Sequence, residues 1–340
     1  MKVAILGVGT VGSEVANILI KNKDIILARA GVSIEPVIGL VRDTSKKRGV
    51  QIPLSSDAQS IIERDDIDVF VELMGGVEKP YEIVSEILKR KKAVVTANKA
   101  LLAYHRYKLQ ALAGDTPFGF EASVAGGIPI IKTLREGLSA NRIEKIIGIV
   151  NGTSNFILTN MMQKNEKFED ALKRAQELGY AEADPSFDIN GTDAAHKITI
   201  LASLAFGIPL QFDSVHIEGI DSLTPDDIQD AAELGYSIKH LGLAVRRDNG
   251  VEIRVHPTLV PQNALIANVN GVMNAVQIQG NAIGNSLYYG PGAGKLPTAS
   301  AVVADLIDVV RELNLKGEDR LAEFGYSEVH DRNSLPVLPA

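Results

Sequence analysis

Short apolar runs alternate with amphipathic segments along the first third of the chain. The runs have the length of buried strands and occur four times, at 2–6, 35–41, 67–74 and 93–97. Helical patterns such as PYEIVSEILKRKK lie between them. Strands that alternate with helices at this spacing are typical of α/β proteins with a Rossmann-type, doubly wound parallel sheet. We expect that fold here, with a last strand near PFGFEAS.

The pattern changes after residue 131. Strand-like segments, among them IEKIIGIV, VEIRVHPTLV and NAVQIQG, are interleaved with helical patterns, including one near 226–244. Such a mixture indicates a second, α+β domain. A glycine turn and a long amphipathic helix follow, and the tail SLPVLPA lacks a regular pattern. We expect one domain from 1–131 plus 293–340, a second from 132–292, and an unstructured tail.

The composition excludes several classes of function. The formal net charge of −7 gives no positive field that would attract nucleic acid or anionic lipid. The longest apolar run, ITILASLAFGIPL, is shorter than the roughly 20 residues of a membrane-spanning helix. The chain has no cysteine, which excludes disulfides and thiol catalysis, and its six histidines lack metal-helix spacing. We therefore expect a cytoplasmic protein without nucleic-acid or membrane partners.

The glycine-rich sequence GVGTVG at 7–12 follows the first apolar run and precedes a helical pattern. This context matches the G-x-G-x-x-G fingerprint of dinucleotide-binding folds. In that motif, Gly7, Gly9 and Gly12 allow a tight turn and bring the backbone close to a pyrophosphate at the helix N-terminus. The alternative is a glycine-rich turn in a fold that has lost its ligand. We expect a bound dinucleotide.

The end of the second predicted strand indicates which dinucleotide is preferred. NAD sites usually carry an acidic residue at this point to bind the ribose hydroxyls. Here Arg42 precedes the only acid, Asp43, and three cations follow at 46–48. A guanidinium with neighbouring lysines suits a 2′-phosphate, so NADP is favoured without excluding NAD. A solvated charged loop is the alternative.

Two polar residues follow the fourth predicted strand. Thr96 and Lys99 lie in the sequence KAVVTANKALL, at the carboxyl end of that strand. Open α/β sheets bind their ligands outside the carboxyl ends of their strands. A lysine at this edge can face the nicotinamide ring. We therefore expect both residues in the cofactor site.

Four carboxylates and one lysine crowd the sequence YAEADPSFDINGTDAAHKITI. Asp193 and Lys197 are four residues apart and would share one face of a helix, where an exposed pair contributes only about 0.3–0.5 kcal/mol. The nearby carboxylates of Glu182, Asp184 and Asp188 and the apolar run that follows indicate instead a charged lysine in a partly buried cleft. Such a lysine can protonate a carbonyl oxygen that receives hydride, while the carboxylates bind a substrate ammonium group.

Six segments, in order, resemble homoserine dehydrogenase: GVGTVG, TANKALL, FEASVAGGIP, NGTSNFIL, GYAEADPSFDINGTDAAHK and GPGAGKLPTASAV. The resemblance covers nearly the whole chain. It implies NAD(P)H-dependent, reversible reduction of L-aspartate 4-semialdehyde to L-homoserine in threonine, methionine and isoleucine biosynthesis. It also implies acid/base catalysis by Lys197, support at the reacting oxygen by Lys99, and substrate binding by Glu182 and Asp193, with Asp188 and Thr153 as neighbours.

The same resemblance implies further ligands and an assembly. The cofactor residues that it implies are Thr10, Val11, Arg42, Thr96, Lys99 and Gly294. It implies a monovalent cation such as sodium, held by Glu121 and by oxygens of Val124, Gly126 and Ile128. The alternative for that segment is a tight glycine turn. A homodimer formed through the second domain, which is then the catalytic and dimerisation domain, is also implied. Because the chain ends soon after the long helix, we expect no C-terminal ACT regulatory domain.

Two rival functions are considered. Aspartate-semialdehyde dehydrogenase shares the metabolite, but its acyl-enzyme chemistry needs a cysteine nucleophile, which this sequence lacks. The other rival is a Rossmann-fold nucleotide-sensing regulatory protein without turnover. The joint presence of Glu182, Asp193 and Lys197 argues against it, and a turnover assay distinguishes the two.

Overall fold

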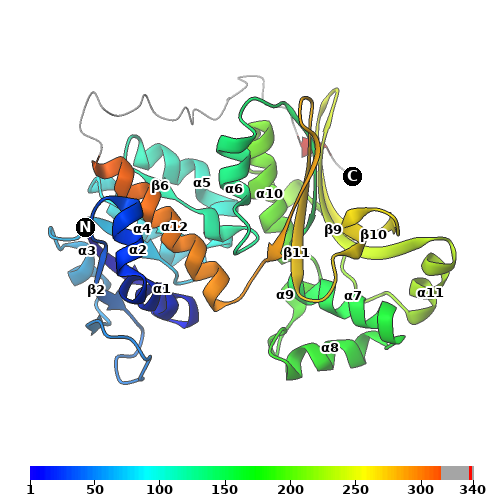
Figure 1. Ribbon diagram of the computed structural model, residues 1–340, viewed down its shortest axis with the longest axis horizontal. Coiled ribbons are helices and arrows are strands. Elements are labelled where there is room, and N and C mark those ends of the chain that lie inside the picture. Colours follow the sequence, from blue (N-terminus) through cyan, green and yellow to red (C-terminus); the bar gives the residue numbers. More distant parts are fainter. Residues whose placement is uncertain (315–336, 339–340) are drawn as a thin grey trace. The chain divides into compact units, whose positions relative to one another are not determined.

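The computed structural model describes residues 1–314 and 337–338. These residues form two compact units, each with its own sheet (Figure 1). Unit 1 holds Met1–Pro129 and the chain from Ala293 through 314, and unit 2 holds Ile130–Gly292 and residues 337–338. The sequence-based boundary lay after residue 131 and assigned the whole C-terminal segment to the first domain. In the structure, residues 130–131 and 337–338 belong to unit 2.

Unit 1 is built on a parallel sheet with the strand order β3-β2-β1-β4-β5-β6. The strands are β1 (Lys2–Leu6), β2 (Glu35–Leu40), β3 (Leu54–Ser55), β4 (Val69–Glu72), β5 (Ala93–Thr96) and β6 (Phe118–Gly119). The order reverses at β1, which makes the carboxyl ends of β1 and β4 the topological switch point where such sheets bind ligands. The predicted doubly wound parallel sheet is confirmed.

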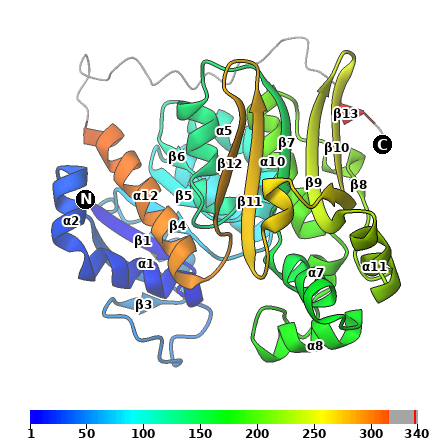
Figure 2. The ribbon, with the colours of Figure 1, turned by 45° about the vertical axis from the view of Figure 1, so that its right-hand side comes forward.

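Helices cover both faces of this sheet, because alternate strand residues point to opposite sides. The helices are α1 (Thr10–Lys21), α2 (Lys23–Ala30), α3 (Ala58–Ile62), α4 (Glu78–Lys89), α5 (Lys99–Ala113) and α12 (Lys295–Asn314), with a 3-10 turn η1 (Glu121–Ser123). Val3 and Ile5 of β1 belong to a core shared with α1, α2 and α12. Ala4 and Leu6 belong to a separate core with α3, α4 and α5. Figure 2 shows α1 and α12 together in front of the sheet.

Unit 2 is built on a mixed, mainly antiparallel sheet with the order β12-β11-β7-β9-β10-β13, and β8 also pairs with β10. The long strands are β7 (Ile143–Ile149), β9 (Tyr236–Arg247), β10 (Gly250–Pro261), β11 (Met273–Gly280) and β12 (Gly284–Pro291). The two short strands are β8 (His216–Ile217) and β13 (Val337–Leu338). The expected α+β second domain is confirmed.

The helices of unit 2 include the two that carry the polar residues singled out in the sequence. Helix α7 (Gly152–Lys164) follows β7, and α10 (Thr192–Phe206) contacts β7, β9 and β10. This packing is close: a Cβ on Gly242 of β9 would lie 3.2 Å from Cβ of Ile198. The other helical segments are α6 (Ile130–Lys132), η2 (Thr133–Gly137), α8 (Phe168–Glu177), α9 (Ser186–Ile189), η3 (Phe212–Ser214), α11 (Pro225–Glu233) and η4 (Leu265–Asn268).

Two local predictions were wrong. The helix expected near 226–244 ends at Glu233, because Gly235 adopts a left-handed φ of +81° and stops it. The chain continues as β9, which pairs with β10 along its whole length. In the tail that was expected to be unstructured, residues 337–338 form β13 and pair with residues 251–252.

Candidate functional site

The three glycines of the turn in unit 1 differ in how closely other atoms pack against them. Gly7 has φ of +105°, its N–H donates to the Leu40 carbonyl at 3.1 Å, and a Cβ there would lie 2.6 Å from the Leu73 oxygen. A Cβ on Gly12 would lie 2.2 Å from the Gly7 oxygen. A Cβ on Gly9 would meet no atom within 4 Å. The fold therefore requires Gly7 and Gly12, whereas the backbone at Gly9 is open to a ligand.

The first turn of α1 has the electrostatics of an anion site. Thr10 and Val11 begin the helix, whose N-cap offers no side-chain hydrogen bond and whose first turn has no acidic residue. Unpaired N–H groups at a helix N-terminus attract phosphate. The nearest acid in sequence, Glu14, is 3.2 Å from Lys295 at the start of α12. Gly294 precedes Lys295 with φ of +109°, a conformation that favours glycine.

The charged loop after β2 presents Arg42 to solvent. Asp43 turns back into the loop, where the Ser45 hydroxyl and N–H donate to its carboxylate at 2.6 and 2.9 Å and hold its pKa below the usual value. Arg48 donates to the carbonyls of Asp43 and Lys46. Within the described residues, Arg42 makes no hydrogen bond or ion pair. The loop is thus shaped by Arg48, and the Arg42 guanidinium is left for another partner.

Thr96 belongs to a buried network that sequence reasoning missed. Its hydroxyl donates to the Glu72 carboxylate at 2.6 Å and accepts from the Asn98 N–H at 3.0 Å. Glu72 is fully buried at the end of β4 and also accepts from the Met74 N–H at 2.8 Å. Burial raises the pKa of Glu72, while the hydrogen bond from Thr96 lowers it. Since the Thr96 hydroxyl proton is committed to Glu72, this side chain shapes the sheet edge.

The other residue predicted at this edge begins helix α5. The side chain of Asn98 caps that helix by accepting from the Leu101 N–H at 3.1 Å, and it donates to the Gly76 carbonyl at 2.8 Å. Lys99 follows as the first helical residue and is half-buried. The cap therefore fixes where the Lys99 side chain leaves the backbone, next to the carboxyl ends of β4 and β5.

The segment expected to hold a cation has the features of a carbonyl-lined site. Glu121 is 6% exposed, and Val124, Gly126 and Ile128 are also buried. The chain turns through two successive left-handed residues, Ala125 at φ of +55° and Gly126 at +48°. Among the turn and loop hydrogen bonds of the described residues, none uses the carbonyl oxygens of Val124, Gly126 or Ile128. A buried carboxylate in the same segment as such carbonyls supplies the oxygen ligands that a small cation prefers.

In unit 2, the lysine and aspartate of α10 form a buried ion pair. Lys197 Nζ lies 2.7 Å from Asp193 Oδ2 and donates to the Val150 carbonyl at 2.7 Å. Lys197 is 9% exposed and Asp193 is 2% exposed. The pair is therefore not the solvated surface pair that its spacing also allowed. A carboxylate and a carbonyl both favour the ammonium form of a buried lysine.

Asn151, which sequence reasoning did not single out, joins this pair to a second carboxylate. Its Nδ2 group donates to Asp188 Oδ1 at 2.7 Å and to Asp193 Oδ2 at 2.8 Å. Its Oδ1 atom accepts from the Ser154 N–H at 2.8 Å and caps α7. The signal in the sequence was an asparagine between a strand and a helix, which predicts a cap but not the two carboxylate contacts.

Among the residues that the structure describes, the other two predicted to bind substrate, Thr153 and Glu182, are not part of this hydrogen-bonded group. The Thr153 hydroxyl is buried and donates to the Tyr180 carbonyl at 2.7 Å, so it anchors the segment that leads to Glu182. The Glu182 side chain is exposed, and the backbone carbonyl of Glu182 accepts from the side-chain amide of Gln176 at 3.1 Å. No hydrogen bond within the described part of the chain joins the Glu182 carboxylate to Lys197 or Asp193. The structure brings together Asp188, Asp193 and Lys197, but not Glu182.

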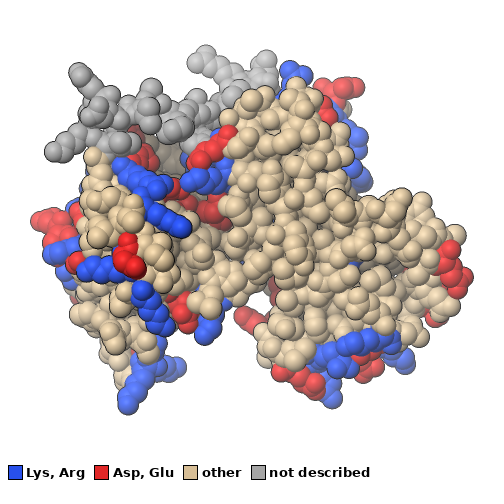
Figure 3. Space-filling view, in the orientation of Figure 1, with Lys and Arg blue, Asp and Glu red and all other residues tan. Residues whose placement is uncertain are grey.

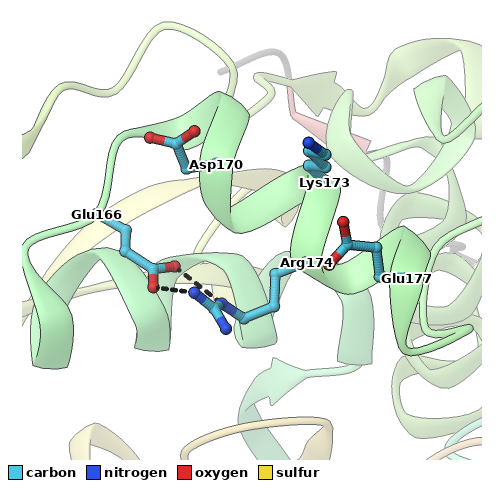
Figure 4. Close-up of a pocket in the computed structure, with 5 residues that line it drawn as sticks. All are labelled: Glu166, Asp170, Lys173, Arg174 and Glu177. Atoms are coloured by element: carbon cyan, nitrogen blue, oxygen red, sulfur yellow. Dashed lines mark hydrogen bonds and ion pairs between the residues drawn. The ribbon is translucent and has the colours of Figure 1, made fainter.

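A shallow surface hollow on α8 contains none of these residues. It is lined by Glu166, Asp170, Lys173, Arg174 and Glu177, and Arg174 pairs with both oxygens of Glu166 (Figure 4). Acidic and basic side chains lie next to each other over this part of the molecule (Figure 3). Such mixed, exposed charges are typical of a solvated helix face.

Comparison with known proteins identifies the family. A family model described as homoserine dehydrogenase matches residues 129–307, and one described as homoserine dehydrogenase, NAD binding domain, matches residues 7–118. The chain belongs to the homoserine dehydrogenase family. It is therefore an NAD(P)-dependent oxidoreductase that acts on a CH–OH group of a small molecule. The resemblance seen in the sequence is confirmed, and the comparisons give no support to a regulatory protein without turnover.

Individual relatives agree with this assignment. The chain is 53% identical over 312 residues to homoserine dehydrogenase of Helicobacter pylori, covering 92% of this chain and 74% of the relative. It is 52% identical to that of Pseudomonas aeruginosa, covering 100% and 79%. A crystal structure of a homoserine dehydrogenase from Thiobacillus denitrificans superposes with a TM-score of 0.95 at 50% identity, covering 100% of this chain and 79% of that one.

A more distant structure bears on the cofactor. A hyperthermophilic archaeal homoserine dehydrogenase in complex with NADPH is 27% identical, with a TM-score of 0.76, and the match covers 91% of this chain and 97% of that one. Together with the match to an NAD-binding domain, this supports a nicotinamide cofactor for the chain. The described residues include no helix that is both long and apolar enough to cross a membrane.

Proposed function

We propose that this protein reduces L-aspartate 4-semialdehyde to L-homoserine with NADPH, and catalyses the reverse reaction with NADP. In this proposal unit 1 is the dinucleotide-binding domain and unit 2 is the catalytic and dimerisation domain. The observation that carries the chemistry is the network in unit 2 that joins the buried residues Lys197, Asp193 and Asn151 to the half-buried Asp188. It combines one cation that can release a proton with two carboxylates that can bind an ammonium group.

Lys197 is the proposed proton donor. The nicotinamide, when bound, supplies hydride to the aldehyde carbon, and the carbonyl oxygen gains the electron pair of its π bond. The Lys197 ammonium group then gives one proton to that oxygen, which yields the alcohol and a neutral amine. Asp193 and the Val150 carbonyl, each 2.7 Å from Nζ, keep the ammonium group charged before transfer and fix its position. Lys99 is proposed to assist at the same oxygen.

The carboxylates are proposed to recognise the amino end of the substrate. Asp188 and Asp193 converge on one asparagine, so both can attract the same ammonium group. Glu182 and Thr153 are the other two residues proposed to bind the substrate. Glu182 is exposed on a segment that Thr153 anchors, and its part in the proposal is to reach the substrate rather than the lysine.

The cofactor is proposed to be NADP(H) in preference to NAD(H). The support is Arg42, an exposed guanidinium two residues beyond β2, together with an Asp43 carboxylate that is occupied by Ser45. The pyrophosphate is proposed to lie against Gly9, Thr10 and Val11, with Thr96, Lys99 and Gly294 lining the rest of the site. Gly7 and Gly12 shape the turn.

A monovalent cation such as sodium is proposed to bind Glu121 and the oxygens of Val124, Gly126 and Ile128. The support is that Glu121 is buried in the same segment, and that no turn or loop hydrogen bond of the described residues uses these three carbonyl oxygens. Asp305 of α12 accepts from the Glu121 N–H at 2.7 Å and so anchors this turn. Such a cation would stabilise the turn without taking part in hydride transfer.

The assembly is proposed to be a cytoplasmic homodimer formed through unit 2. The face over β9 and β11 carries few charged side chains (Figure 3). Large apolar residues are exposed in unit 2, among them Leu259 at 53%, Leu265 at 73% and Tyr289 at 58%. A face of this kind favours self-association. Sedimentation at several protein concentrations tests it, and a monomer at all of them would contradict this part of the proposal.

The decisive experiment is a turnover assay with the purified protein. Loss of NADPH absorbance is measured with aspartate semialdehyde as substrate, and the product is identified as homoserine. Repeating the assay with NADH gives the cofactor preference. Absence of turnover with both cofactors, in a protein that binds NADPH, would overturn the proposed function.

A further inference from the structure

We infer that Asn151 is a positioning residue of the proposed active site, whose amide holds Asp188 and Asp193 in the arrangement that binds the substrate ammonium group. This inference rests on the proposed function. Asn151 follows β7, is 6% exposed, and donates from one nitrogen to a carboxylate oxygen of each aspartate. Two carboxylate oxygens bonded to one nitrogen lie within a few ångströms of each other.

Two carboxylates this close repel each other unless donors stabilise both ionised forms. Lys197 supplies one donor, and it goes to the oxygen of Asp193 that Asn151 also uses. The amide of Asn151 also donates to the Asp188 carboxylate and so links it to the pair. The amide thus brings one oxygen of each carboxylate to the same nitrogen, so that the two side chains converge on one point.

The amide is itself held rigidly. Its Oδ1 atom accepts from the Ser154 N–H, and the Ser154 hydroxyl donates to the backbone carbonyl of Asp188 at 2.9 Å. The neighbouring Val150 carbonyl accepts from Lys197. Residues 150–151 therefore fix the lysine and both aspartates from one point at the end of β7.

The position requires asparagine for a chemical reason. Aspartate, serine and threonine also cap helices, because each offers an oxygen to the N–H groups of the first turn. Only asparagine offers that oxygen together with two N–H donors at this side-chain length. An ionised aspartate would cap α7 equally well but would turn the two donors into a third carboxylate.

Asn155 provides a matched control. It lies in the first turn of α7, the helix that Asn151 caps, is 1% exposed, and donates from Nδ2 to the carbonyls of Val269, Gly271 and Met273. Asn155 and Asn151 thus each take part in three side-chain hydrogen bonds, but none of those that the structure describes for Asn155 goes to Asp188 or Asp193. Substituting Asn155 tests what loss of a buried amide does to this part of the fold.

The test compares Asn151→Asp, Asn151→Ala and Asn155→Ala with the parent. The readout is the ratio of kcat/KM for aspartate semialdehyde to kcat/KM for succinate semialdehyde, which is the same aldehyde without the amino group. We expect this ratio to fall about 10- to 100-fold in both Asn151 variants, because hydrogen bonds to charged groups are lost. In Asn155→Ala the ratio is expected to stay within about twofold, whatever its stability.

Melting temperature and NADPH affinity are measured first, because NADPH binding by unit 1 reports an intact cofactor domain. If Asn151→Ala does not fold, Asn151→Asp still decides, since its carboxylate can accept from the Ser154 N–H. An unchanged ratio in Asn151→Asp, or an equal fall in Asn155→Ala, would overturn the inference while leaving the proposed function intact. A parent protein without turnover would instead reject the proposed function.

Discussion

A lysine ammonium group that is buried between a carboxylate and a carbonyl is held in its charged form. Lys197 is in this position, with both acceptors at 2.7 Å. Removing only one partner of such a pair leaves an uncompensated charge inside the protein. The two contacts therefore hold the Lys197 ammonium group in place, which the proposed proton transfer requires.

Replacing Lys197 by alanine tests this role. General acid help contributes about 10²- to 10⁴-fold in rate, so turnover is expected to fall by that order. Affinity for NADP(H) should remain nearly unchanged, because the glycine turn lies in unit 1. The measurement is a rate constant together with a cofactor titration. Turnover within threefold of the parent would show that the pair with Asp193 is only structural.

Replacing Arg42 by alanine tests the cofactor preference. The guanidinium is exposed and is the first side chain beyond β2 that can pair with a 2′-phosphate. We expect the Michaelis constant for NADPH to rise about tenfold or more, as a lost charge-assisted pair implies, with little change for NADH. Substituting Arg48, which donates to two carbonyls within the loop, is the control for loop shape. Equal effects on both cofactors would remove this assignment.

At the level of single residues, the sequence indicated what depends on local spacing. Asp193 and Lys197 are four residues apart on one helix, so their contact was readable from the pattern. The contacts of Asn151 with Asp188 and of Thr96 with Glu72 span 37 and 24 residues. Such contacts exist only once strands and helices are placed beside each other, which is why Asn151 and Glu72 were missed.

At the level of elements, two glycines of the same turn have different roles: Gly12 is required by the packing of the fold, and Gly9 is expected to be required for cofactor binding. A Cβ at Gly12 would overlap the Gly7 carbonyl at 2.2 Å, whereas a Cβ at Gly9 would meet nothing within 4 Å. Gly12→Ala is therefore expected to lower the melting temperature. Gly9→Ala is expected to leave the melting temperature of the cofactor-free protein unchanged and to weaken NADPH binding at least about tenfold.

Differential scanning calorimetry and an NADPH titration on the two glycine variants check this prediction. The effect at Gly9 would come from the added methyl group lying where the pyrophosphate approaches the backbone. Unimpaired NADPH binding by Gly9→Ala would contradict the proposed position of the cofactor. A loss of stability at Gly9 would show that this glycine also serves the fold.

The elements of unit 1 were more predictable than those of unit 2. Buried parallel strands read as short apolar runs, and β1, β4 and β5 are buried almost throughout. In unit 2, the segment after Glu233 keeps a mixture of apolar and polar residues that suits either a helix or a strand. Antiparallel pairing with β10, which begins only three residues after the end of β9, makes this segment a strand.

At the level of the whole molecule, the pH dependence of folding stability includes a buried lysine, Lys239, that belongs to neither proposed site. Lys239 of β9 is 1% exposed, and its ammonium group donates to the Val269 carbonyl at 2.7 Å and to the Asn270 side-chain oxygen at 2.9 Å. Both acceptors are neutral. Burial accordingly lowers the pKa of Lys239 to about 8, from an ordinary value of 10.5.

This shift predicts how stability changes with pH. Between pH 8 and 10.5, the folded protein loses the Lys239 proton while the unfolded chain keeps it, so the unfolded state binds more protons. The contribution of Lys239 to the free energy of unfolding therefore rises with pH across this window, by at most about 1.4 kcal/mol per pH unit. Below pH 8 both states are protonated, and the contribution is constant.

Replacing Lys239 by methionine tests this prediction. Lys239→Met removes the titrating group, so the difference in free energy of unfolding between parent and variant should grow with pH in favour of the parent above pH 8. Urea denaturation at fixed protein concentration, from pH 7 to 10, measures this difference. A difference that stays constant over that range would mean that Lys239 keeps its ordinary pKa in the folded protein.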